Sequence, residues 1–139
     1  MKKLILLLFI PLVFTCSDDA DSSNSNGNSI NPPSWLQGLW VYEDGSYGYE
    51  FRSDDFCTYL PIGQVNYTCY KSQVELHSAT NSSVIQSSTE NSYELDIVLI
   101  SYEYHYEFIK ISENSIRCIG CLYDEDQILI KQWKSYYLL

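Results

Sequence analysis

The cysteines are the residues of this chain whose type and spacing most directly suggest chemistry. Cys57 and Cys69 lie symmetrically about Gly63. A hairpin that turns at this glycine would place the two cysteines opposite each other on paired strands. Because that separation suits a disulfide bond, we expect Cys57 and Cys69 to be joined.

The second cysteine pair, Cys118 and Cys121, is only three residues apart. On a straight strand the two side chains would point to opposite faces, so they can join only if Gly120 bends the chain, as a bulge would. A redox Cys-x-x-Cys site would require a helix N-terminus to lower the thiol pKa, and no helix is expected here. A zinc site made of all four cysteines is a further alternative, but the spacing of the first pair is long for it.

The remaining residues offer little for catalysis. The sequence has two histidines and none of the common motifs for a nucleophilic serine, a zinc-binding histidine pair or a phosphate-binding loop. His105 lies between Glu103 and Glu107, where a solvated strand surface and a weak metal site are the two interpretations. The acidic run at residues 124–126 lacks the spacing and the glycine of a calcium loop. We therefore predict no enzymatic activity, no cofactor and no bound metal.

Aromatic residues alternate with polar ones in a single predicted strand. Tyr102, Tyr104, Tyr106 and Phe108 share one face, and charged residues occupy the other. In a small barrel an inward aromatic face fills the core. The alternative is a pocket lined with rings and hydroxyl groups, which would bind a small apolar or planar ligand. These four residues are the candidate ligand-binding residues.

The N-terminus has the features of an export signal. Two lysines precede an apolar run at residues 4–14, which is too short to span a bilayer as a helix. The run ends in Val-Phe-Thr-Cys, which resembles a bacterial lipobox in which residues 1–15 are removed and Cys16 is acylated. The Ser-Asp-Asp that follows resembles a signal for export to the cell surface in Bacteroidetes-type bacteria. The resemblance implies an outer membrane lipoprotein; an ordinary secreted protein, cut elsewhere, is the alternative.

The segment after Cys16 is polar and the chain is acidic. Residues 17–33 contain only two apolar side chains, Ala20 and Ile30, so we expect a disordered tether that holds the domain away from the membrane. After removal of residues 1–15, six Lys and Arg face eighteen Asp and Glu. This charge excludes nucleic acid as a favoured partner and leaves the acylated Cys16 as the contact with the lipid bilayer.

Residues 34–139 are long enough for one domain, which we expect to be a monomer. Short runs of Tyr, Thr, Ile and Val with period two, broken by Gly, Asn, Ser and Asp, predict antiparallel strands and almost no helix. We predict an all-β, up-and-down meander barrel of about eight strands, with a β-sandwich as the alternative. The predicted strands are residues 38–43, 47–53, 56–60, 65–76, 81–89, 93–100, 102–111, 115–122 and 127–134.

The first predicted strand contains Gly38-Leu39-Trp40, which is similar to the Gly-x-Trp signature of lipocalins. The resemblance implies that Trp40 covers the closed end of the barrel, that Trp35 and Leu36 form a short plug there, and that the last strand pairs with the first. With the lipobox and the polar segment, the layout resembles small lipocalin-like lipoproteins of Bacteroidetes-type bacteria. The Thr-Asp-Tyr motif of lipocalins is absent, and no arginine near the C-terminus is available to pack on Trp40.

Two classes of function follow from these features. A lipocalin-like barrel would bind a small hydrophobic or planar molecule on the aromatic face. A barrel with a filled core would instead serve as an interaction, structural or inhibitor protein. The two differ in whether the aromatic face encloses a cavity.

Overall fold

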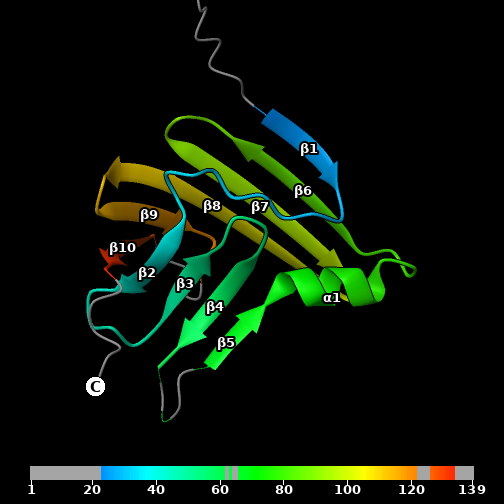
Figure 1. Ribbon diagram of the computed structural model, residues 1–139, viewed down its shortest axis with the longest axis horizontal. Coiled ribbons are helices and arrows are strands. Elements are labelled where there is room, and N and C mark those ends of the chain that lie inside the picture. The colour runs from blue at the N-terminus through cyan, green and yellow to red at the C-terminus, as the bar shows by residue number, and fades with distance from the viewer. Residues whose placement is uncertain (1–22, 62, 64–65, 122–125, 134–139) are drawn as a thin grey trace, which may run out of the picture.

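The computed structural model describes residues 23–61, 63, 66–121 and 126–133. These residues form one antiparallel sheet of ten strands and a single short helix (Figure 1). The strands are β1 (Ser23–Gly27), β2 (Gly38–Tyr42), β3 (Gly48–Phe51), β4 (Phe56–Leu60), β5 (Asn66–Cys69), β6 (Ser83–Ser88), β7 (Ser92–Leu99), β8 (Tyr102–Ser112), β9 (Ser115–Ile119) and β10 (Gln127–Gln132); the helix is α1 (Tyr70–His77). The prediction of an all-β fold is confirmed.

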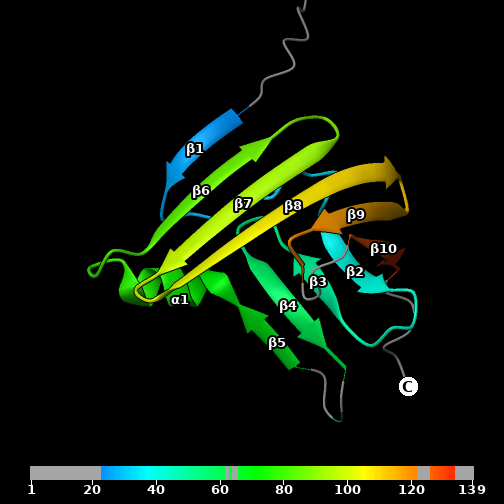
Figure 2. The same ribbon diagram turned by 180° about the vertical axis from the view of Figure 1, so that it is seen from behind.

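The sheet is an up-and-down meander that curls into a half-barrel. Its strand order is β1-β6-β7-β8-β9-β10-β2-β3-β4-β5. As expected, the last strand pairs with the strand that carries Trp40, which lies opposite Lys131 of β10. All ten strands belong to one sheet, which differs from the two packed sheets of the β-sandwich alternative. The sheet edges are β1 and β5, and α1 connects β5 to β6 across this opening (Figures 1 and 2).

Helix α1 corrects the prediction of a continuous strand over residues 65–76. Strand β5 ends at Cys69 and the helix begins at Tyr70. Tyr70 and Val74 are four residues apart and both are buried, which is the spacing of a helix face that packs on a core. At the first turn, the backbone N–H of Lys71 donates to Oδ1 of Asp55 at 2.9 Å. A carboxylate from another part of the chain therefore stabilises the start of this helix.

The prediction of a disordered tether over residues 17–33 is wrong for residues 23–33, which belong to the folded domain. Strand β1 pairs with β6, and Ile30 is only 1% exposed. The buried Gln86 side chain holds the segment in place: its amide donates to the Ser29 carbonyl, and its oxygen accepts from the Asn31 backbone N–H, both at 2.9 Å. The burial of Ile30 and these hydrogen bonds offset the entropy cost of ordering a polar segment.

The inside of the half-barrel is filled by side chains. Rings from β3, β4, β8 and α1 contact one another, with the Tyr49, Phe56 and Phe108 centroids between 5.5 and 5.9 Å apart. The largest fully buried side chains are Trp40, Tyr49, Tyr93, Phe51, Phe56, Phe108, Ile30, Leu36, Leu95, Ile97, Ile116 and Leu129. The interior is therefore a packed core of the kind that small barrels form.

Candidate functional site

Trp40 lies at one end of the half-barrel, in contact with the turn that precedes β2. Its indole Nε1 donates to the Leu36 carbonyl at 2.6 Å, and Leu36 is itself buried in a turn closed by its N–H and the Pro33 carbonyl at 3.0 Å. Gly38 adopts a φ of 128°, a conformation that favours glycine, and lets Lys131 approach. The Lys131 ammonium lies 4.9 Å from the Trp40 ring centroid. The cation that packs on Trp40 is therefore a lysine of β10.

The cysteine pairs form disulfide bonds in the structure. Cys57 and Cys69 are directly opposite on β4 and β5, with Cα atoms 4.0 Å apart. Cys118 and Cys121 are joined across a bend in which Gly120 has a φ of 73°, which is the bend that their pairing requires. Asp55 lies close to Cys57 and Cys69, but both sulfurs are bonded to each other and are not available to a metal. Cys16 lies outside the described residues.

The aromatic row of β8 runs from the core to the surface. Phe108 and Tyr106 are buried, Tyr104 is partly buried, and Tyr102 is 69% exposed. Neighbouring rings stack along the strand with centroids 6.1 to 6.5 Å apart. The four candidate residues thus divide into two that fill the core and two that reach the open end of the half-barrel, opposite to Trp40.

The hydroxyl group of Tyr106 has a partner inside the core. Its oxygen lies 3.2 Å from the hydroxyl oxygen of Tyr70 on α1. Burial raises the pKa of Tyr106, and burial likewise raises the pKa of Tyr70. Both side chains are therefore neutral hydrogen-bonding groups, and the polar end of Tyr106 is satisfied by the protein without a ligand.

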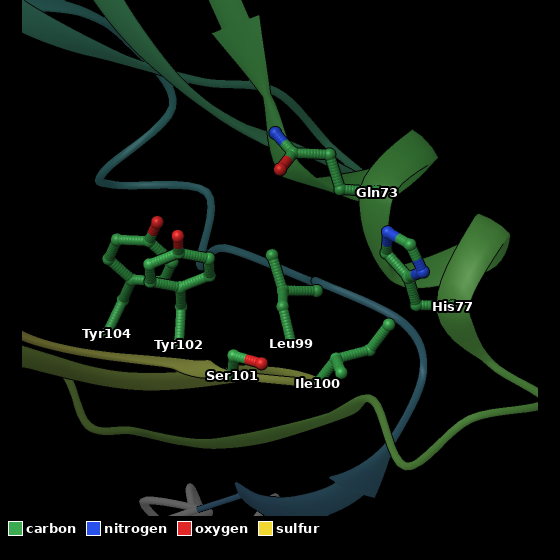
Figure 3. Close-up of a pocket in the computed structure, with 7 residues that line it drawn as sticks. All are labelled: Gln73, His77, Leu99, Ile100, Ser101, Tyr102 and Tyr104. Carbon is green, nitrogen blue, oxygen red and sulfur yellow. The ribbon is translucent and has the colours of Figure 1, made fainter.

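A pocket of about 330 Å³ lies at this open end, between α1 and the turn that joins β7 to β8 (Figure 3). In this view the Tyr102 and Tyr104 rings stand side by side, with Leu99 next to them, while Gln73 and His77 extend from the helix on the other side of the pocket, His77 beside Ile100. The pocket is lined by Gln73, His77, Leu99, Ile100, Ser101, Tyr102 and Tyr104. We refer to these seven residues as the mouth pocket.

The mouth pocket combines aromatic rings and aliphatic side chains with hydrogen-bonding groups. The Tyr102 and Tyr104 rings are 6.4 Å apart and tilted by 24°. The amide of Gln73 and the imidazole of His77 can donate and accept hydrogen bonds, and none of the seven lining residues carries a carboxylate. Such a site can hold a small planar molecule against the rings and bind its polar edge from the helix.

Sequence reasoning missed the helical half of this pocket. The predicted strand over residues 65–76 includes Gln73 and leaves His77 in the loop after it, whereas the spacing of Tyr70, Val74 and His77 is the available signal for a helix. The sequence also did not predict the backbone conformation of Ile100, which has a φ of 29° in the two-residue turn between β7 and β8. A β-branched residue is strained in this region, so the turn places an exposed Ile100 at the pocket at an energetic cost.

Within the described residues, the second histidine pairs with a single carboxylate and is not part of a group of three potential metal ligands. His105 Nδ1 lies 2.5 Å from Asp96 Oδ1 on the outer face of β7 and β8, and the side chains are partly exposed. Among the described residues, one group of three potential metal ligands is found: Asp55, Cys57 and Cys69. The sulfurs of the two cysteines are joined in a disulfide. Of the acidic run at residues 124–126, only Asp126 is described, and it is exposed.

Comparison of the chain with protein-family models, curated proteins and solved structures gave no significant match. Within the described residues, α1 is the one helix, and it is neither long nor apolar enough to cross a membrane.

Proposed function

We propose that this protein is a monomeric, non-enzymatic outer membrane lipoprotein, anchored through an acylated Cys16, whose half-barrel binds a small planar ligand in the mouth pocket. The observation that carries the binding proposal is the pair of Tyr102 and Tyr104 rings beside an open pocket, opposite Gln73 and His77. Aromatic faces attract planar apolar molecules, and the polar groups opposite them would orient the ligand.

The size and position of the pocket support a small ligand bound at the rim rather than a long one inside the barrel. Its volume of about 330 Å³ is at the lower end of the range for ligand sites. Deeper along the same row, Tyr106 and Phe108 are packed against Tyr49 and Phe56. A long acyl chain would have to displace these rings, so we propose that the ligand lies on Tyr104 and does not enter the core.

The filled core also supports the second candidate, an interaction or inhibitor protein. In that case the exposed rings and aliphatic side chains at the mouth would contact a protein rather than a small molecule. The two candidates differ in whether an isolated small molecule binds, which the next experiment measures.

We expect Tyr104→Ala to weaken binding of a planar aromatic ligand by about tenfold or more, because ring contact contributes on the order of 1 kcal/mol beyond buried area. Binding is measured by calorimetry after a thermal-shift screen of planar aromatics and fatty acids. The matched control is Tyr67→Ala, which removes a tyrosine on β5 that is not part of the pocket. No binding by the parent protein, or equal loss in both variants, would favour the interaction protein.

The membrane anchor is tested separately. We expect Cys16→Ser to leave the membrane fraction, either in the medium or as an uncut precursor, because the thiol that carries the acyl chains is gone. Fractionation of cells that express each form measures this. A variant that stays with the membranes as a cut protein would contradict the lipoprotein proposal.

A further inference from the structure

The chain enters the half-barrel at the end that is remote from the mouth pocket. The strand register shows this directly: Ser23, the first residue of β1, is level with Ser88 of β6 and, across β7, with Phe108 of β8. Gly27, at the other end of β1, is level with Val84 and, across β7, with Tyr104. In Figures 1 and 2, β1 runs toward the end where α1 lies.

The distance between the two ends limits how the domain can face the membrane. From Tyr93 to Leu99, β7 covers about 20 Å at the usual rise of a strand. The ordered β1 shortens the connection, so that only seven residue steps separate Cys16 from Ser23, and even a fully extended chain covers at most about 25 Å. The mouth could reach the bilayer only if this connection were almost fully stretched along the side of the domain.

The charges near the mouth also oppose contact with a lipid surface. Glu75 on α1 lies between the pocket residues Gln73 and His77 in sequence, Glu103 on β8 lies between Tyr102 and Tyr104, and both glutamates are exposed. Lys71, one helical turn before Glu75, forms its ion pair with Asp54. A surface of this charge is repelled by anionic head groups, although Leu76, Ile100 and Tyr102 are exposed there.

We infer that the mouth pocket faces away from the membrane and takes its ligand from the aqueous medium, as a water-soluble planar molecule with a polar edge. This inference rests on the proposed function and on acylation of Cys16. A phospholipid or another molecule dissolved in the bilayer is excluded as the ligand, because it would have to cross the length of the domain to reach Tyr104. The exposed side chains of Leu76, Ile100 and Tyr102 then add apolar surface that a ligand from the medium can contact.

The orientation can be measured without any ligand. Ala79→Cys and Glu90→Cys place a fluorescent label just beyond the two ends of β6, at the mouth and at the opposite end, and neither residue belongs to the mouth pocket. The acylated protein, with its disulfides intact, is reconstituted in phosphatidylcholine vesicles that carry an acceptor on the head groups. We expect energy transfer to place the Ala79 label at least about 17 Å further from the membrane than the Glu90 label. Equal or reversed distances would overturn the inference.

The source of the ligand is measured with the same vesicles. A planar aromatic probe identified in the thermal-shift screen is added in water, and a pyrene-labelled phospholipid is offered in the bilayer. We expect the anchored protein to bind the water-borne probe as tightly as a soluble Cys16→Ser form without residues 1–15 does, and to leave the labelled lipid unbound. Binding of the lipid, or affinity for the probe that is about tenfold lower in the anchored form, would overturn the inference. Failure of the soluble form to bind the probe would refute the proposed function instead, and the label distances would still decide the orientation.

Discussion

Trp40→Ala is expected to lower the free energy of unfolding by about 3 to 5 kcal/mol, which is a large part of the stability of a domain of this size. The indole is 1% exposed, donates a hydrogen bond to the Leu36 carbonyl and packs beneath the Lys131 ammonium. Alanine leaves a cavity between β2, β10 and the preceding turn, and it leaves the buried Leu36 carbonyl without this donor. Urea denaturation followed by circular dichroism measures the change.

Trp133→Ala is the matched control, because Trp133 is 66% exposed just beyond β10. We expect its free energy of unfolding to stay within about 0.5 kcal/mol of the parent value. A Trp40 variant as stable as the Trp133 variant would show that the end of the half-barrel does not depend on the indole, and would remove the structural basis of the lipocalin resemblance.

The strands were predictable because their signals are local. Alternation of Tyr, Ile and Val between turn residues predicted most of the positions of β2 to β4 and β6 to β10, and the position of Gly63 between two cysteines predicted their pairing. The pairing of β10 with β2 followed from the lipocalin resemblance rather than from alternation. It joins distant parts of the chain, which periodicity alone does not specify.

The two fold errors share a physical cause, because in both segments tertiary partners decide the structure. The polar residues of β1 have no strand pattern, but β6 pairs with them and the buried Gln86 binds the segment that follows. The helix after Cys69 is short, and it depends on the Asp55 carboxylate at its first turn and on burial of Tyr70 and Val74. Neither set of partners is close in sequence to the segment it stabilises.

The sequence predicts one part of the candidate site, the aromatic face of β8, but not the part that depends on contacts between distant segments. The aromatic face of β8 follows from period two, but the depth at which it passes from core to surface depends on which elements cover it. Tyr70 of α1 meets Tyr106, and β3 and β4 supply Tyr49 and Phe56. The question of core or pocket therefore has a different answer at each end of the row.

Tyr106→Ala is expected to destabilise the domain almost as strongly as Trp40→Ala, by about 3 to 5 kcal/mol, because it removes a ring that contacts Tyr49, Phe56 and Phe108. It also leaves the Tyr70 hydroxyl without the contact at 3.2 Å. Denaturation midpoints in urea, measured for the parent and the variant, give the loss.

Two comparisons separate a structural role of Tyr106 from a role in binding. Tyr106→Phe keeps the ring and removes only the hydroxyl, so we expect a loss of about 1 to 2 kcal/mol from the Tyr70 hydroxyl that remains buried, with unchanged affinity for the planar ligand. Tyr104→Ala, which removes a partly exposed ring from the same strand, should instead cost less stability than Tyr106→Ala and lose affinity. If Tyr106→Ala left the stability intact and abolished binding, the ligand would have to occupy the inside of the half-barrel, and the division of the aromatic row into core and mouth would be wrong.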